Sequence, residues 1–345
     1  MENTSRRKFI KSMSMGGSVI GAAGVSGFAT SRHVMPEQNS HSPREVWIAS
    51  MTQEGMTGNT VREVIDGALH QMEIALSNSP DIICLPEVFH VAGVRGGRPP
   101  LEETVENGDG QLVGPFQKFA QDHNCYVICP IYSREGGRIY NAAFVIDRKG
   151  TVLGTYKKIR PTIDEVKKGI SPGPREVPVF DTDFGRVGIQ ICYDIEWDEG
   201  WEQLRNKGAE IVFWPSAFAG GAKVNTKAWT HQYCVVSSTR KDTTKMCDIT
   251  GENLVSSGLW SSWGICAPVN LEKVIIHSWP ASNKFPEIQK KYGRKINCYS
   301  YHEEEFSVIE SLSSDVKVRD VLREFDMVSY RESLEEAEKY QRGKL

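Results

Sequence analysis

The sequence has no long apolar run and no excess of basic residues. No hydrophobic segment reaches the roughly 20 residues that a spanning helix requires, so we expect no membrane span in the mature chain. The formal net charge of the 345-residue chain is −3, whereas electrostatic binding to nucleic acid needs a basic stripe. We therefore expect no nucleic-acid partner.

The sequence also lacks the cysteine and histidine spacing of a metal site. No CxxC pair and no Cys/His cluster with zinc-ligand spacing occurs. An even number of cysteines indicates disulfides mainly in short secreted chains, and several of these cysteines lie in strand-like runs where a free thiol usually packs as a small core residue. We therefore expect no metal site. The eight cysteines stand at positions 84, 125, 129, 192, 234, 247, 266 and 298.

The N-terminus does carry a paired-arginine motif before a weakly apolar stretch. The motif is Ser5-Arg-Arg-Lys-Phe-Ile-Lys11, and a segment rich in Gly, Ala and Ser follows it from Met13 to Ala29. A basic segment before a short apolar one is typical of an export signal, and paired arginines indicate the twin-arginine route. We expect residues 1–35 to be this signal with a linker, and the mature protein to be periplasmic or secreted. The alternative is a basic tail without a targeting role.

Apolar spacing along the chain predicts an α/β protein. Residues 60–77 have the spacing of an amphipathic helix, and residues 81–86 form a short apolar run closed by a proline. Two strand-like runs, 140–146 and 152–156, flank a Gly-containing turn and predict a hairpin; a second hairpin is expected between 177–180 and 187–192. Alternating helices and strands with hairpins indicate a mixed sheet or two packed sheets.

Further elements are predicted between and after these segments. The pattern indicates strands at 46–51, 126–131 and 211–214 and helices at 114–123 and 199–207. From about residue 280 the chain becomes polar and ends in a helical pattern from Asp320 to Lys339. We divide the chain into the signal at 1–35, a main domain at 36–280, and a C-terminal extension with a terminal helix at 281–345.

Three residues are candidates for one catalytic site. Cys192 ends an apolar strand, where ligands of α/β proteins gather and where the turn into a helix lowers the pKa of a thiol. Glu87 follows another buried strand and could serve as a general base. Lys158 follows the first hairpin and could stabilise an oxyanion. Each residue alone is more often structural: an inert core thiol, a solvated turn acid, a solvated edge lysine.

The order of the motifs around these residues is more specific. A strand followed by Pro86-Glu87, then Tyr156-Lys-Lys158, then Gly188-x-x-x-Cys192-Tyr-Asp194, and finally Gly208-Ala-Glu-Ile-Val-Phe-Trp-Pro-Ser216 resembles the nitrilase superfamily of carbon–nitrogen hydrolases. The resemblance extends from about residue 46 to about residue 278. It implies an αββα sandwich of two mixed sheets flanked by helices, paired into homodimers or larger homo-oligomers, and a Glu-Lys-Cys triad that needs no cofactor.

The resemblance also assigns roles to individual residues. Glu87 is the base, Lys158 stabilises the oxyanion and also makes the thiol easier to ionise, and Cys192 is the nucleophile. Glu165 matches a second carboxylate that positions the lysine or water, although it could simply be an acid at a helix start. The candidate oxyanion and substrate-binding positions are Tyr193, through its backbone N–H, and Trp197, Glu199 and Ser216.

Local departures from the family pattern affect the expected substrate. Arg160 stands where many members have His, and Asp198 stands where they have Pro. Tyr193-Asp194 in place of Trp-Glu favours the amidase and carbamoylase branches over true nitrilases. We expect a small amide or ureido substrate, cleaved at a C–N bond through a cysteine thioester. Two alternatives remain open: an acyltransferase that passes the thioester to an amine, and an inactive binding scaffold of the same fold.

Overall fold

The computed structural model describes residues 44–344. The signal and linker expected at 1–35 lie outside the described residues. Within the described part, no helix has both the length and the apolar character needed to cross a bilayer.

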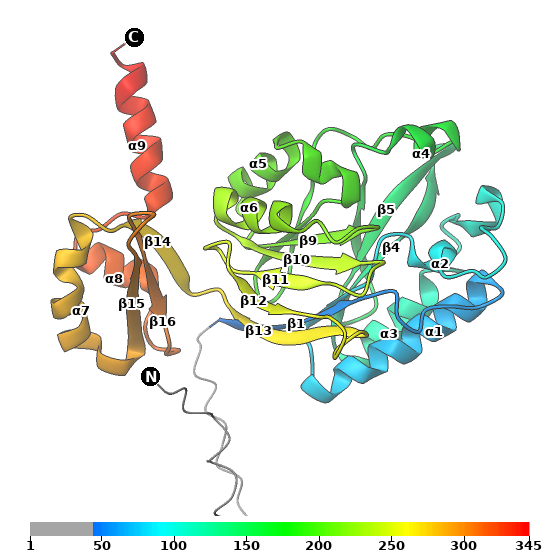
Figure 1. Ribbon diagram of the computed structural model, residues 1–345, viewed down its shortest axis with the longest axis horizontal. Helices are drawn as coiled ribbons and strands as arrows, with labels where there is room; N and C mark the ends of the chain where they lie inside the picture. The colour runs from blue at the N-terminus through cyan, green and yellow to red at the C-terminus, as the bar shows by residue number, and fades with distance from the viewer. Residues whose placement is uncertain (1–43, 345) are drawn as a thin grey trace, which may run out of the picture. The chain divides into compact units, whose positions relative to one another are not determined.

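The first large sheet has seven strands (Figure 1). Its order is β13-β1-β2-β4-β5-β6, with β3 paired to β4. The strands run β1 Glu45–Met51, β2 Ile82–Cys84, β3 Val105–Glu106, β4 Tyr126–Glu135, β5 Arg138–Ile146, β6 Val152–Lys157 and β13 Gly264–Asn270. Glu87 follows β2 and Lys158 follows β6 in the chain.

The second large sheet has six strands and leads into Cys192. Its order is β12-β11-β10-β9-β8-β7, with β8, β9 and β10 parallel and the remaining neighbours antiparallel. The strands run β7 Val179–Asp181, β8 Arg186–Ile189, β9 Ile211–Ser216, β10 Cys234–Thr239, β11 Lys245–Cys247 and β12 Asn253–Ser256.

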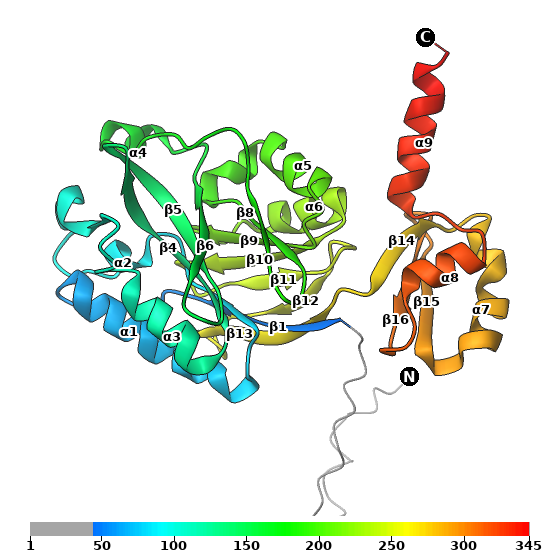
Figure 2. The same ribbon diagram turned by 180° about the vertical axis from the view of Figure 1, so that it is seen from behind.

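The two sheets pack face to face and helices cover their outer faces (Figures 1 and 2). Ile48 and Ile82 of the first sheet share a core with Val212 and Val235 of the second, and the buried Ser50 hydroxyl bonds Ser238 across the interface at 2.7 Å. This αββα arrangement confirms the fold class predicted from the sequence. The helices are α1 Val61–Ala75, α2 Phe89–Ala92, α3 Gly114–His123, α4 Ile163–Lys167, α5 Glu199–Asn206 and α6 Ala222–His231.

Helix α1 shows why the outer layers form where they do. Thr60 caps its first turn by accepting a hydrogen bond from the Glu63 N–H. Its apolar side chains at positions 64, 65, 68, 72 and 75 recur at helical spacing and are all buried. They pack with the outer face of the first sheet and with α3.

The C-terminal region contains a third, three-stranded sheet that the sequence analysis did not predict. Its order is β14-β16-β15, and β14 begins before the boundary expected at residue 280. It has a separate apolar cluster that includes Ile276, Ile296 and Val321. The strands and helices of this region are β14 Lys273–His277, β15 Ile296–Tyr301, β16 Phe306–Ser311, α7 Phe285–Tyr292, α8 Val318–Glu324 and α9 Tyr330–Arg342.

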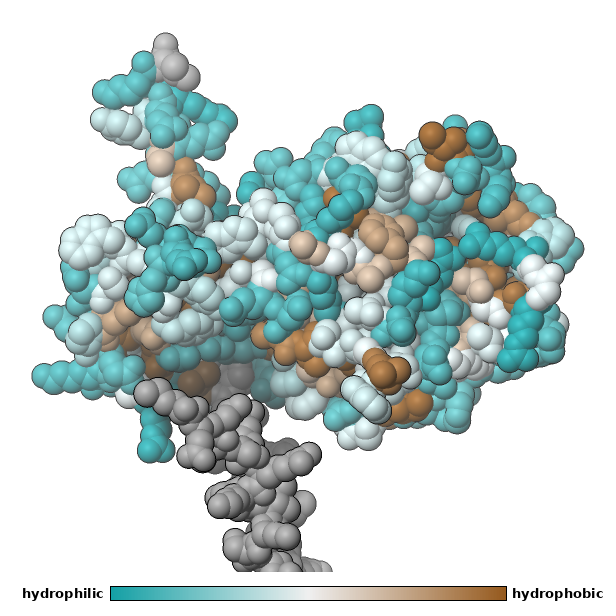
Figure 3. Space-filling view, viewed as in Figure 1, coloured by the Kyte–Doolittle hydropathy of each residue, from teal (hydrophilic) through white to brown (hydrophobic). Residues whose placement is uncertain are grey.

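The single terminal helix expected from 320 to 339 is two helices in the structure. Asp326 adopts a left-handed backbone with φ 49°, which interrupts the right-handed helix. Ser329 then starts α9 through a reciprocal capping box with Glu332. No residue of α9 is buried, and its surface is mostly hydrophilic (Figure 3).

Candidate active site

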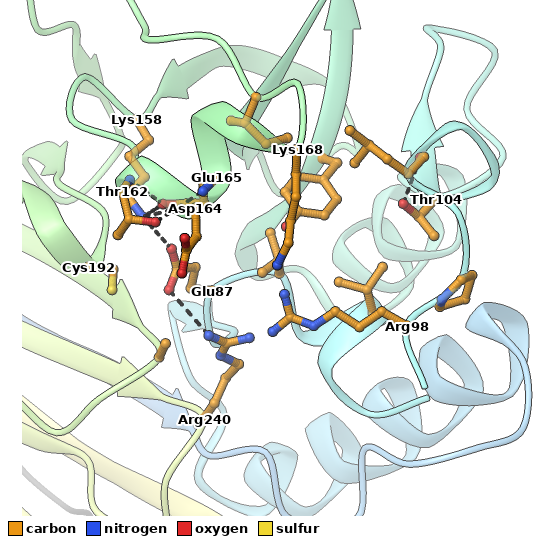
Figure 4. Close-up of a pocket in the computed structure, with 17 residues that line it drawn as sticks. Glu87, Arg98, Thr104, Lys158, Thr162, Asp164, Glu165, Lys168, Cys192 and Arg240 are labelled. Carbon is orange, nitrogen blue, oxygen red and sulfur yellow. Dashed lines mark hydrogen bonds and ion pairs between the residues drawn. The ribbon is translucent and has the colours of Figure 1, made fainter. Parts of the chain in front are cut away.

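A cavity of about 590 Å³ contains all four residues predicted to be catalytic. This volume lies within the range usual for small-molecule sites, about 300–1,000 Å³. Glu87 lies just after β2, Lys158 just after β6, Glu165 in α4 and Cys192 just after β8. Residues separated by up to about a hundred positions in the chain thus line one cavity (Figure 4).

Lys158 is the centre of a buried ion network. Its ammonium donates to Glu87 Oε1 at 2.8 Å and to both Glu165 oxygens, at 2.8 and 3.1 Å. The lysine side chain is 1% exposed. Burial opposes its charge, but the negative charges of Glu87 and Glu165 outweigh burial and raise the pKa of the ammonium well above its ordinary value. The lysine is therefore a fixed positive charge inside the cavity.

Asn141 of β5 holds the two carboxylates in place, and the sequence analysis missed it. The fully buried amide donates at 2.8 Å to Glu87 Oε1 and, with its other hydrogen, at 2.8 Å to Glu165 Oε1. The backbone carbonyl of Asn141 also accepts a hydrogen bond from the backbone N–H of Lys158 at 2.8 Å. A single asparagine thus ties the positions of the lysine and both acids together.

The second oxygen of Glu87 is available for proton transfer. Glu87 Oε2 is buried and makes no hydrogen bond within residues 44–344, and its ion-pair partner there, Arg240 Nη2, is 3.9 Å away. A buried carboxylate oxygen without a donor is costly. Such an atom is suited to receive a proton from a nearby thiol or from water.

Cys192 lies in a strained turn between β8 and the 3-10 helix Cys192–Glu196. Its φ is 47°, a left-handed conformation that costs a non-glycine residue on the order of 1–3 kcal/mol. Buried Asp194 stabilises the turn by accepting from the backbone N–H of Ile191 at 2.9 Å, from that of Arg160 at 2.8 Å, and from the Tyr156 hydroxyl at 2.7 Å. Because the turn is fixed in this way, the thiol faces the cavity.

The pKa of the resting Cys192 thiol is set by opposing effects, of which burial is the largest. Burial and then the negative charge of Glu87 raise the pKa of Cys192 to about 12, although Lys158, the Ala217 backbone and the Ser216 hydroxyl act in the opposite direction. Lys158 does lower the pKa of the thiol, as expected from the sequence, but the desolvation of a thiol that is only 7% exposed outweighs it. A neutral thiol requires a base when it attacks.

The four predicted oxyanion and substrate-binding residues do not line the cavity with their side chains. The Tyr193 and Trp197 rings pack edge-on, 5.0 Å apart, and both are more than a third exposed. Glu199 begins α5 at the surface and pairs with Arg160 at 3.1 Å. These three side chains lie on the outer side of the Cys192 turn, because the turn directs the cysteine inward.

Ser216 and the Tyr193 backbone are nevertheless close to the nucleophile. The Ser216 hydroxyl is fully buried and favours the thiolate form of Cys192 by hydrogen bonding. The backbone N–H of Tyr193 belongs to the first turn of a helix, where N–H groups have no partner within the helix. Within residues 44–344, no group of three or more His, Cys, Asp and Glu side chains is arranged to hold a metal ion.

Comparison with known proteins gives the family. Residues 46–241 match the model of the carbon-nitrogen hydrolase family. The chain is 47% identical over 152 residues to the probable hydrolase YhcX of Bacillus subtilis, covering 42% of this chain and 29% of that protein. It is 32% identical over 124 residues to the beta-ureidopropionase of Arabidopsis thaliana, covering 34% of this chain and 30% of that protein.

Comparison with solved structures supports the fold. The crystal structure of an amidase from Nesterenkonia sp. matches with a TM-score of 0.55 at 18% identity, over 67% of this chain and 90% of that one. The chain spans less than two thirds of the length of the curated relatives that it matches. Because the family model covers more than half of the sequence, the protein belongs to the carbon-nitrogen hydrolase family of the nitrilase superfamily.

Proposed function

We propose that the protein hydrolyses a C–N bond of a small amide or N-carbamoyl substrate, with Cys192 as the nucleophile. The observation that carries the proposal is the position of the Cys192 thiol in one cavity with a Glu87–Lys158–Glu165 network buried at its wall. A buried lysine between two carboxylates is costly to fold. Its place beside a thiol and a substrate-sized space is what catalysis requires.

Acylation follows from the protonation states of the site. Glu87 accepts the Cys192 proton as the sulfur attacks the carbonyl carbon. A base is needed at this step because the pKa of the thiol is raised. Negative charge moves to the carbonyl oxygen, where the Lys158 ammonium and the Tyr193 N–H stabilise it. The tetrahedral intermediate then breaks its C–N bond, and ammonia or an amine leaves with the proton held by Glu87.

The same groups then hydrolyse the thioester, with water in place of the thiol as the attacking group. Glu87 takes a proton from water, and the hydroxide attacks the thioester carbon. The C–S bond breaks, the acid leaves, and Cys192 regains a proton. Glu165 is a positioning residue in this scheme, because it holds the lysine ammonium through two hydrogen bonds.

The proposal is tested by measuring ammonia release from a panel of amides, ureido acids and nitriles. We expect turnover of amides or ureido acids and its complete loss in Cys192→Ala, which leaves a side chain of nearly the same volume in the turn. Cys298→Ala, on β15 of the C-terminal sheet, is the matched control and should keep full activity. Undiminished turnover by Cys192→Ala would rule the proposal out.

We also propose that the protein is exported by the twin-arginine route. The support is the Arg6-Arg7 motif before the weakly apolar segment. Replacement of both arginines by lysine should abolish export of the protein, as measured by cell fractionation. Unchanged export of that variant would contradict the proposal.

A further inference from the structure

Three cationic side chains converge on one part of the cavity. Arg98 comes from the segment between α2 and the next 3-10 helix, Lys168 from the end of α4, and Arg240 from the residue after β10. Figure 4 shows their charged ends pointing toward one another, with Cys192 on the far side of Glu87 from Arg98. Three elements far apart in the sequence thus direct positive charge into the same space.

These cations have few partners in the protein. Within residues 44–344, the Arg98 and Lys168 side chains form no hydrogen bond and no ion pair, and Arg240 has Glu87 at 3.9 Å as its ion-pair partner. One further carboxylate, Asp164, lines this part of the cavity. Arg148, which is only 20% exposed, pairs by contrast with Asp81 and Asp183, each at 2.7 Å. Arg98 and Lys168 are exposed to solvent, so their N–H donors can reach an anion that enters the cavity.

We propose that the substrate carries a carboxylate, bound by Arg98, Lys168 and Arg240, in addition to the amide or ureido group attacked by Cys192. This inference rests on the proposed hydrolase function and names its substrate class. A guanidinium offers a planar pair of donors that matches a carboxylate, and an ammonium adds a point charge. A bound carboxylate would be the counterion that Arg98 and Lys168 do not have within residues 44–344.

The rest of the cavity wall is partly apolar, which suits the carbon chain of a small acid. Val91, Leu101 and Ile170 line the cavity with apolar surface. Glu87 and Glu165 repel a carboxylate from the space beside Cys192, while Arg98 and Lys168, which form no ion pair within residues 44–344, attract it. A short-chain acid with a terminal amide or ureido group therefore enters in one orientation.

Matched pairs of substrates test the inference. Glutaramate is compared with the neutral valeramide, and N-carbamoyl-β-alanine with the neutral N-propylurea, by kcat/KM for ammonia release. We expect the anionic member of a pair to be preferred, and Arg98→Gln or Lys168→Met to reduce that preference by about tenfold to a hundredfold, the effect of a charge-assisted hydrogen bond. Lys167→Met, the neighbouring lysine that does not line the cavity, should leave the preference unchanged.

A binding measurement keeps the test independent of turnover. Glutarate should slow the alkylation of Cys192 by iodoacetamide in the wild-type protein, and this protection should be lost in the double variant Arg98→Gln/Lys168→Met. Ammonia release from the neutral substrates alone, without glutarate protection, would overturn the inference and leave the hydrolase function standing. Protection that depends on both cations, with no ammonia from any substrate, would support the anion site and overturn the hydrolase function.

Discussion

Among residues 44–344, two buried lysines lie between pairs of carboxylates, and only one of these two clusters faces a substrate-sized cavity. Lys158 pairs with Glu87 and Glu165, with side chains 1%, 3% and 17% exposed. Lys273 of β14 pairs with Asp248 at 3.1 Å and with Glu310 of β16 at 3.3 Å, and those side chains are 6%, 6% and 16% exposed. In both clusters, neighbouring negative charge raises the pKa of the lysine against the opposing effect of burial.

The difference between the clusters lies in their surroundings. The Lys158 network shares its cavity with the strained Cys192 turn and with three further cations. The Lys273 cluster joins the C-terminal sheet to the loop after β11, and its three residues line none of the cavities described within residues 44–344. Burial of charge alone therefore does not identify a catalytic site; a nucleophile and a substrate-sized space must adjoin it.

The largest effects are expected from replacing the two buried lysines, because one is proposed to act in catalysis and the other in stability. Lys158→Ala should lower kcat by about 10²–10³, the scale of losing an oxyanion donor. Lys273→Met should leave kcat near wild type but lower the free energy of unfolding by about 3–5 kcal/mol, because it leaves buried carboxylates without a partner. Steady-state kinetics and urea denaturation of both variants measure the two effects. A large loss of kcat in the folded Lys273→Met variant would contradict a purely structural role for Lys273.

A smaller effect concerns the ionisation of the thiol. Glu87→Gln should lower the pKa of Cys192 from about 12, because it removes the negative charge beside the sulfur, and Lys158→Met should raise it. The lowering in Glu87→Gln should amount to about 1 to 3 pH units, as is usual for a neighbouring charge. The rate of Cys192 alkylation as a function of pH, followed by mass spectrometry, gives these values. Shifts in the same direction in both variants would contradict the account.

The smallest effect is on stability in acid. Burial opposes ionisation of Glu165, but Lys158 outweighs it and lowers the pKa of the carboxyl below its ordinary 4.5. A lowered pKa contributes stability that is present above pH 4.5 and is lost as the pH falls through the folded-state pKa. The stability difference between wild type and Glu165→Gln should therefore shrink as the pH is lowered past 4.5. Thermal melts across that range test this, and a difference that grows in acid would contradict it.

The regular elements could be predicted from sequence where their patterns were strongly periodic. The expected hairpin at 140–146 and 152–156 is β5 and β6, and the helix at 60–77 contains α1. The third sheet was missed because β15 leaves most of its residues only partly buried, which weakens the apolar alternation. The break in the terminal helix did have a signal, since Ser329-x-x-Glu332 is a capping-box sequence.

The site was predictable only where motif order carried information. Glu87, Lys158, Glu165 and Cys192 were found through the order of their motifs, and they line one cavity. Asn141, Arg98 and Arg240 are ordinary residue types in unremarkable segments, and the packing of separate strands and loops brings them there. Sequence alone could not show that Trp197 and Glu199 lie outside the cavity, because that depends on the direction of the Cys192 turn.

The most direct test of the central claim is to trap the enzyme during turnover. The reaction is quenched in acid at substrate saturation, and the digested protein is searched by mass spectrometry for an acyl group on each of the eight cysteines. The account predicts an acyl adduct on Cys192 and on no other cysteine, and none in Cys192→Ala. Steady turnover with an adduct at another cysteine instead, or with release of ammonia unaffected in Cys192→Ala, would contradict it.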